Sequence, residues 1–216
     1  MLPRRVWRHA ALSWGARLFF RAVGSPITVT SDGPVPERSA ILIVNHVSYL
    51  DGAVLAAACP GELTFVAKQN LMEQLFAGLF LRKIGTVFVR RTDPSGGVAD
   101  ARFASEVAQS GQRLVWFPEG TFTRMPGLLP FHMGAFQAAC QAGLPVIPVA
   151  IRGTRSILRS DQWLPRRGAI SVHISMPLHP EGGDFTAAVR LRDATRAEIL
   201  RHIDEPDLAN ERIRVG

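Results

Sequence analysis

The sequence has few of the residues that mark several common classes of protein. It contains two cysteines, Cys59 and Cys140, and neither belongs to a CxxC pair. We therefore expect no disulfide framework and no cysteine-based zinc site, and we predict buried thiols in two helices of a protein from a reducing compartment. No apolar run approaches the roughly 20 residues of a membrane-spanning helix. The apolar stretch near the N-terminus is interrupted by Arg17 and Arg21 and lacks a clear signal-peptide cleavage site.

Lysine and tyrosine are also scarce. Only Lys68 and Lys83 are lysines among 25 basic residues, and the formal net charge is +7. Arginine offers a planar fork that matches phosphate, so a phosphorylated substrate, an anionic membrane and nucleic acid are all compatible with this composition. High-GC coding would also explain much of the arginine bias. A basic nucleic-acid-binding module is the less favoured reading, because the chain has one tyrosine and its basic residues follow strands rather than alternating with aromatics.

The remaining composition is that of one globular domain. Apolar residues make up 47% and charged residues 20% of the 216 residues. Strand patterns alternate with helix patterns, which predicts an α/β fold with a mostly parallel central sheet and flanking helices. An N-terminal basic amphipathic helix precedes it. We expect three regions: a membrane-surface helix at 1–24, a globular domain at 25–205 and a frayed tail at 206–216.

The N-terminal helix combines tryptophan and phenylalanine with arginine. This combination suits a helix that lies among lipid headgroups, although ordinary packing against the domain is the alternative. Further helices are expected at 53–59, 70–83, 98–109, 131–141 and 184–203. Strands are expected at 27–30, 41–46, 64–67, 86–89, 114–117, 146–151 and 169–175, with an irregular loop at 152–167. Pro148 lacks an amide donor and therefore indicates a sheet edge or an irregularity in its strand.

Several of the predicted strands run directly into polar residues. Because ligands collect at the carboxyl ends of parallel strands, these residues are expected to share one edge of the sheet. A histidine with a nearby carboxylate and several cations suits a base that acts on a hydroxyl of a phosphate-bearing substrate. For the first turn a capped polar loop is the alternative, because Ser48 and Asp51 are both good N-cap residues. The residues are His46 with Asp51, Lys68, Arg90 with Arg91, and Glu119, Gly120 and Thr121 with Arg124 nearby.

Four segments in this order resemble the glycerolipid acyltransferases, the family of the lysophosphatidate (1-acylglycerol-3-phosphate) acyltransferases. They are NHVSYLD at 45–51, which matches the HxxxxD motif, GTVFVRR at 85–91, FPEGT at 117–121 and VIPVAI at 146–151. The resemblance covers roughly residues 26 to 177. The HxxxxD pattern alone occurs by chance in many proteins, whereas HxxxxD followed by FPEGT is a specific combination.

The resemblance implies an acyltransferase of phospholipid biosynthesis. His46 would deprotonate the acceptor hydroxyl, and Asp51 would orient the imidazole. The acyl donor would be acyl-CoA or acyl-carrier protein, with no further cofactor, and the first acceptor to consider is 1-acylglycerol-3-phosphate. Another lysolipid acceptor and a thioesterase are the alternatives. The enzyme would work as a peripheral or monotopic protein at the cytoplasmic face of the cell membrane.

The same resemblance assigns the binding residues. Lys68, Arg90, Arg91 and Arg124 would hold the acceptor phosphate, and Glu119, Gly120 and Thr121 would bind the acceptor. No metal is expected, because the remaining histidines considered, at 132, 173, 179 and 202, show no metal-ligand spacing. One departure concerns the acceptor: Phe122 stands where the lysophosphatidate enzymes usually carry arginine. This weakens the expectation of a bare phosphomonoester.

Overall fold

The structure, a computed structural model, describes residues 4–36, 38–59, 61, 63–68, 87–89, 111–123, 125–158 and 166–210. The helices predicted at 70–83 and 98–109 lie outside these residues. The rest of the chain alternates strands with helices as predicted, with most boundaries within two residues of expectation.

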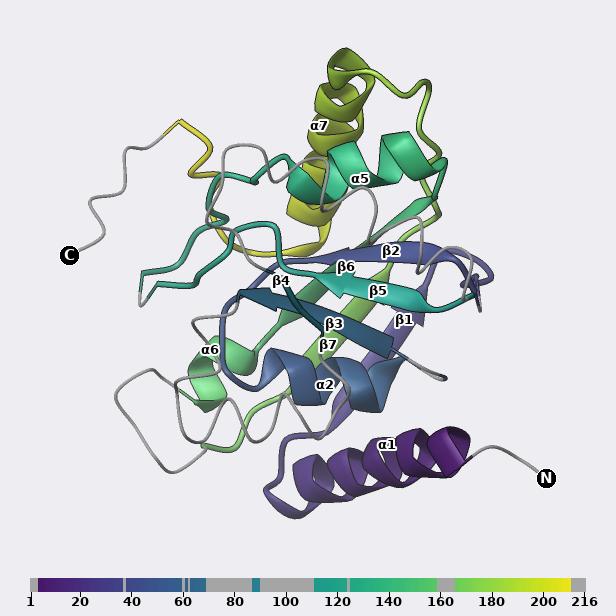
Figure 1. Cartoon of the computed structure of the whole chain (residues 1–216). Coiled ribbons are helices and arrows are strands. Elements are labelled where there is room, and N and C mark those ends of the chain that lie inside the picture. Colours follow the sequence, from purple (N-terminus) through teal and green to yellow (C-terminus); the bar gives the residue numbers. More distant parts are fainter. Residues whose placement is uncertain are drawn as a thin grey trace.

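The described strands form one seven-stranded sheet in the order β1-β7-β6-β2-β5-β3-β4 (Figure 1). All neighbouring strands run parallel except β6 and β7, so the predicted mostly parallel sheet is confirmed. The strands are β1 (Ile27–Ser31), β2 (Ala40–Val44), β3 (Leu63–Lys68), β4 (Val87–Val89), β5 (Arg113–Trp116), β6 (Val146–Arg152) and β7 (Ile170–Ile174).

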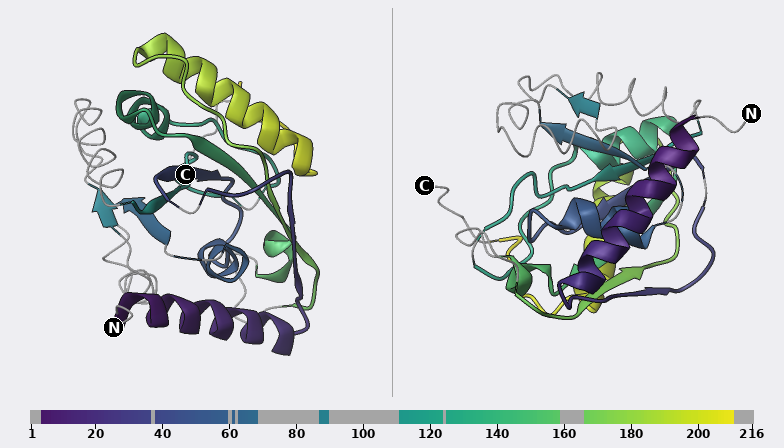
Figure 2. Two further views of the ribbon diagram at one scale, coloured as in Figure 1. Left: turned by 90° about the vertical axis from the view of Figure 1, so that its right-hand side faces the viewer. Right: turned by 90° about the horizontal axis from the view of Figure 1, so that it is seen from below.

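Helices cover both faces of the sheet (Figure 2). One face carries α5 (Gly134–Ala142) and α7 (Phe185–His202), and the other carries α2 (Asp51–Ala58) with α1 (Arg4–Ala22) packed outside it. Asp184 caps α7 as predicted, since its Oδ1 accepts a hydrogen bond from the Ala187 amide at 2.7 Å. The layers explain why β2 is apolar throughout: every residue from Ala40 to Val44 is buried, with alternate side chains in the two cores.

Pro148 lies in the centre of the sheet, so an edge position is excluded and an irregularity is observed. β6 pairs with β2 on one side and β7 on the other. The β6–β7 ladder pairs Val149 with Ile174, but the next bridge joins Val146 to Leu178, so one extra residue lies on the β7 side. The proline carbonyl accepts a bond from the Ser175 amide at 3.0 Å. The missing amide therefore coincides with a bulge in the pairing.

Two further segments differ from expectation. The loop predicted at 152–167 contains a short helix, α6 (Thr154–Ile157), directly after β6. The tail predicted to fray from residue 206 is paired in part: the Leu128 amide donates to the Pro206 carbonyl at 2.8 Å, and the Leu208 amide donates to the Leu128 carbonyl at 3.0 Å. The four-residue helix α6 is too short to show a helical period, and the charged tail has no apolar pattern. Neither feature could therefore be predicted from the sequence.

The N-terminal helix lies along α2 and exposes large apolar side chains. Trp14 is 73% and Leu18 is 69% exposed, whereas Phe20 is buried. Arg17 does not extend away from the protein, since its Nε donates to the Ala57 carbonyl at 2.8 Å and links α1 to α2. Of the helices described, none is both long and apolar enough to cross a membrane.

Candidate active site

The predicted site residues that the structure describes gather at one edge of the sheet. β2, β3, β4, β5 and β6 are mutually parallel, so their carboxyl ends point the same way. His46 follows β2, Glu119 follows β5 and Thr154 follows β6. Lys68 is the last residue of β3, but its side chain lies outside the described part of the structure. Arg90, Arg91 and Arg124 lie outside the described residues altogether.

The imidazole of His46 faces the carboxylate of Asp51. Nδ1 of His46 is 2.9 Å from Oδ2 of Asp51, and the histidine side chain is 21% exposed while the aspartate is fully buried. A carboxylate can only accept a hydrogen bond, so it holds the proton on Nδ1 and leaves the lone pair on Nε2. This is the tautomer that a general base needs.

Asp51 is itself fixed by the turn that carries it. Its Oδ2 accepts bonds from the Val47 and Ser48 amides at 2.7 and 2.9 Å. Its Oδ1 accepts from the hydroxyl of Thr154 at 2.7 Å, and both side chains are fully buried. The N-cap of α2 is Leu50 rather than Ser48 or Asp51, and no side chain caps it. The carboxylate therefore serves the histidine and its turn rather than the helix end.

Glu119 holds the backbone on both sides of the site. Its Oε1 accepts from the His46 amide at 2.6 Å and its Oε2 from the Leu129 amide at 2.9 Å. The residue is 4% exposed, and burial raises the pKa of Glu119 to about 8 although the two amides favour its ionised form. Its binding to the acceptor stays a prediction. The partners seen here show that Glu119 links the loop at 120–130 to the turn that carries His46.

Gly120 and Thr121 complete the turn after β5. Gly120 has φ of 71°, in the region that favours glycine, and its amide donates to the Phe117 carbonyl at 3.2 Å. That amide is therefore committed to the turn and is not a donor for a developing oxyanion. Thr121 is exposed.

Aromatic rings enclose His46. Phe117 stacks on the imidazole with ring centroids 4.3 Å apart, and Phe122 meets it edge-on at 4.6 Å. Tyr49, which is 56% exposed, packs at 84° against Phe122. These contacts cover two sides of the imidazole with apolar rings.

The loop at 120–130 is braced by residues 203–208, which we call the C-terminal latch. Arg155 pairs with Glu205 through two bonds of 2.8 Å and also donates to the Thr123 carbonyl. Glu205 accepts from the Gly127 amide at 2.7 Å. A Cβ at Gly127 would lie 2.2 Å from Cδ1 of Leu208, and the φ of 143° at this position also favours glycine. In Figure 1 the yellow segment after α7 returns beside this teal loop.

Arg196, a residue of α7, also binds the C-terminal latch. Arg196 donates to the carbonyls of Leu128 and Leu129 at 2.7 and 2.6 Å, and it pairs with Asp207. The hydrogen bond from Arg196 is the main reason that the pKa of Asp207 lies below its usual range. Leu129 in turn donates to Glu119, so hydrogen bonds connect the latch to the backbone of His46.

Sequence reasoning missed two polar residues that organise this edge. Asn45 exchanges two bonds with the backbone of Ile151, at 2.7 and 3.0 Å, which aligns the end of β2 with β6. Thr154 supports Asp51 from more than a hundred residues away. Thr154 carries no sequence signal, because threonine is common and nothing before the fold is known brings it near Asp51.

Known proteins resemble this chain over most of its length. The Acyltransferase family model matches residues 26–152, more than half of the chain. A lyso-ornithine lipid O-acyltransferase of Pseudomonas aeruginosa is 32% identical over 193 residues, covering 82% of this chain and 72% of the relative. A 1-acyl-sn-glycerol-3-phosphate acyltransferase of Saccharomyces cerevisiae is 30% identical over 196 residues, covering 85% of this chain. The aligned part spans 65% of the yeast protein's length.

A known crystal structure has the same fold. The crystal structure of a 1-acyl-sn-glycerophosphate (LPA) acyltransferase from Thermotoga maritima superimposes with a TM-score of 0.75 at 24% identity, covering 94% of this chain and 83% of that one. At this identity the likeness establishes the fold. The family model, which covers both the His46–Asp51 turn and Glu119, identifies the family: the chain belongs to the acyltransferase family.

Proposed function

We propose that this protein transfers a fatty acyl group from acyl-CoA or acyl-carrier protein to the hydroxyl of a lysophospholipid. The observation that carries the proposal is the contact between His46 Nδ1 and the buried Asp51 carboxylate, at 2.9 Å, beside a clamp that fixes the His46 backbone. Relatives named for acyl transfer to lysolipids support the same reaction. The first candidate acceptor is 1-acylglycerol-3-phosphate, which would give phosphatidate.

The residues support direct transfer. Nε2 of His46 takes the proton of the acceptor hydroxyl as the oxygen attacks the thioester carbonyl. Collapse of the tetrahedral intermediate expels the thiolate, which takes the proton back from the imidazolium. Asp51 stabilises that imidazolium in between. Ser48 does not act as an acyl carrier in this scheme, since it is fully buried and its hydroxyl donates to the Leu158 carbonyl at 3.3 Å.

A second acceptor class follows from Phe122. Its ring packs on His46 and Tyr49, at the position where phosphate-recognising relatives usually carry arginine. An apolar wall there favours an acceptor that presents hydrocarbon or amide groups near the reacting hydroxyl. The relative from Pseudomonas aeruginosa is named for a lyso-ornithine lipid, which is an acceptor of this kind. We therefore propose an amino-acid-containing lysolipid as the alternative acceptor.

An acceptor panel separates the two classes. Purified protein is supplied with one acyl-CoA and, in separate reactions, with 1-acylglycerol-3-phosphate, a lyso-ornithine lipid or no acceptor, and products are followed by mass spectrometry. Phosphatidate as the main product supports the first candidate. Preference for the lyso-ornithine lipid, with phosphatidate formed only by Phe122→Arg, supports the alternative. Free fatty acid as the main product in every reaction indicates a thioesterase and refutes both.

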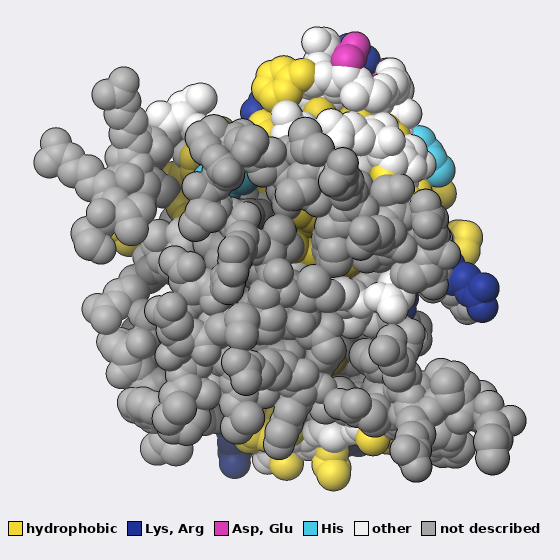
Figure 3. Space-filling model, viewed as in Figure 1, with side chains coloured by type: hydrophobic (Ala, Val, Ile, Leu, Met, Phe, Trp, Pro, Cys, Tyr) yellow, Lys and Arg dark blue, Asp and Glu magenta, His cyan; other side chains and the backbone are white. Residues whose placement is uncertain are grey.

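We further propose that α1 rests on the cytoplasmic face of the membrane, as a peripheral or monotopic contact. Trp14, Leu18 and Phe19 are exposed, and Figure 3 shows hydrophobic side chains projecting along the lower edge of the molecule, where α1 lies. Arg21 adds a cation on the same helix. Large apolar side chains beside arginine suit insertion among anionic headgroups.

Trp14→Ser tests this membrane contact. Burying a large apolar side chain contributes about 1.5–3 kcal/mol, so partition onto anionic vesicles is expected to fall about tenfold or more. Phe185→Ser is the matched control, because Phe185 is equally aromatic and 60% exposed but begins α7 on the other face of the sheet. Sedimentation with vesicles provides the measurement. Equal binding by both variants would leave α1 with a packing role alone.

A further inference from the structure

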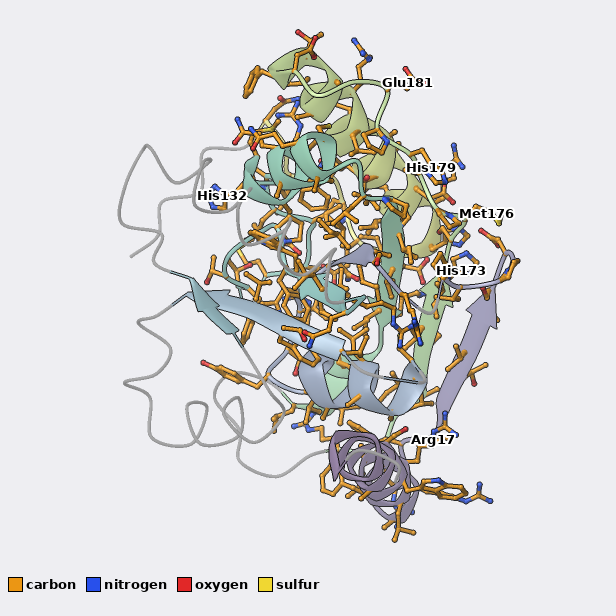
Figure 4. The ribbon with its side chains drawn as sticks, turned by 45° about the vertical axis from the view of Figure 1, so that its right-hand side comes forward. Arg17, His132, His173, Met176, His179 and Glu181 are labelled. Carbon is orange, nitrogen blue, oxygen red and sulfur yellow. The ribbon has the colours of Figure 1, made fainter. Side chains whose placement is uncertain are left out.

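Three potential metal ligands meet on the β1–β7 side of the sheet, away from the catalytic turn. Asp32 follows β1, His173 lies in β7 and His202 is the last residue of α7. One potential ligand atom from each lies within 4.8 Å of the other two. Figure 4 places His173 near β1, on the opposite side of the molecule from His132. β7 is two strands away from β2, so this cluster shares no residue with the site of His46.

The fold directs these side chains toward one another. Val172 and Ile174 point into the core beside α2, so His173 between them points to the other face, where α7 lies. Its Nε2 is 3.2 Å from Oδ2 of Asp32. The ring of His202 stacks on it with centroids 3.5 Å apart and planes 16° apart. Rigid elements therefore hold two imidazoles and a carboxylate together.

Each imidazole also has a second polar partner. Oγ1 of Thr30 is 2.9 Å from Nδ1 of His173, and Oε1 of Glu198 is 3.3 Å from Nε2 of His202. Outer partners of this kind fix the orientation of metal-binding histidines and polarise the ring.

Charge favours a cation between these groups. Two carboxylates flank the stacked rings, since Asp32 faces His173 and Glu198 faces His202. Two imidazoles and a carboxylate together are a donor set that zinc prefers. The side chains of Asp32, His173 and His202 are 40%, 16% and 29% exposed, which leaves access for the ion and a water ligand.

We propose that Asp32, His173 and His202 form a binding site for a divalent transition metal of the zinc class. Zn–N and Zn–O bonds of about 2.0–2.2 Å require the ligand atoms, now within 4.8 Å of one another, to draw closer. They also require the two stacked imidazoles to turn out of their near-parallel arrangement, so that both ring planes meet the ion. The ion would tie β1, β7 and the end of α7 together. Because residues 203–208 follow His202 directly, it would also anchor the C-terminal latch.

Titration calorimetry with Zn2+ tests the site on the full chain after dialysis against EDTA. We expect one equivalent to bind at neutral pH, and His202→Gln to weaken binding by about tenfold or more. His179→Gln is the matched control, since His179 is exposed on the same side of the molecule and outside the cluster. Zn2+ binding that is unchanged in His202→Gln, or equally reduced in His179→Gln, overturns the proposal.

Asp32→Asn is a second test in case His202→Gln fails to fold, because Asp32 lies on an exposed turn where a substitution is tolerated. It is expected to fold normally and to bind Zn2+ several-fold more weakly. Thermal unfolding gives a second readout: Zn2+ should raise the Tm of the native protein and of His179→Gln, and raise it less in Asp32→Asn and His202→Gln. An equal rise in all four proteins would place the ion elsewhere and refute the site.

Discussion

At the scale of single residues, the site depends on how buried polar groups are satisfied. Asp51 receives hydrogen bonds from an imidazole, two amides and a hydroxyl, and Glu119 receives two from the backbone. Such groups are costly to bury without partners. Their partners therefore fix the position of His46 within narrow limits. Support for the base comes from three strand ends that are far apart in sequence.

Thr154→Val should impair catalysis while the protein still folds. The substitution keeps the shape but removes a hydrogen bond to a buried carboxylate, worth about 1.5–3 kcal/mol. We expect kcat for acyl transfer to fall about tenfold or more with little change in KM, since Thr154 supports Asp51 and does not bind substrate. Thr154→Ser, which keeps the hydroxyl, should restore most of the rate. Equal rates for the valine variant and the native protein would refute this role.

Glu119 should give stability a pH dependence of its own. Its pKa rises from 4.5 to about 8 on folding, so between these values the folded protein holds a proton that the unfolded chain has released. This contribution is fully present below pH 4.5 and is lost as the pH rises toward 8, by at most about 1.4 kcal/mol per pH unit.

Glu119→Gln isolates that contribution, because glutamine does not titrate. Urea unfolding at pH 5, 6, 7 and 8 would give the free energy of unfolding of each protein. We expect it to fall with pH more steeply in the native protein than in the variant. Parallel curves for the two proteins would mean that Glu119 keeps an ordinary pKa in the fold.

At the scale of elements, the C-terminal latch connects the end of α7 to the catalytic turn. Residues 203–208 brace the loop at 120–130, and that loop reaches the His46 amide through Glu119. The same loop carries Phe122, whose ring contacts the imidazole of His46. Loosening the latch should therefore affect catalysis although none of its residues lies next to the base.

Glu205→Gln tests the latch. It breaks a two-bond ion pair with Arg155 in which both side chains are less than 20% exposed, and it weakens the acceptor for the Gly127 amide. We expect the free energy of unfolding to fall by about 1–3 kcal/mol and kcat/KM to fall several-fold. Glu181→Gln is the control, because Glu181 is 83% exposed and lies 3.8 Å from Arg190. Equal activity in the two variants would leave the latch with a packing role only.

At the scale of the whole molecule, sequence patterns predicted the layout well because the layout follows from burial. The run before His46 contains only apolar residues, as expected of β2, which is buried on both faces. The motif residues come directly after strands that run parallel, so they meet at one edge of the sheet. The family is confirmed by its model. These features are encoded locally, in runs of a few residues, so they can be read without knowledge of the fold.

Contacts between distant segments could not be read in the same way. Thr154 reaches Asp51, the latch reaches Gly127, and Asp32 meets two histidines only after the sheet has formed. Pro148 is an example: its missing amide predicted an irregularity, but not that its strand lies inside the sheet between two others. The roles predicted for Lys68, Arg90, Arg91 and Arg124 stay predictions.

The proposed acyl transfer depends on His46 as its base. The most direct measurement compares native protein and His46→Ala in the same assay, with acyl-CoA and the best acceptor of the panel and with product followed by mass spectrometry. Circular dichroism would verify that the variant folds. General-base assistance contributes roughly 10²–10⁴-fold, so we expect acylated product to form at least about a hundredfold more slowly. Product formation within about tenfold of the native rate by a folded His46→Ala protein would contradict the proposed mechanism.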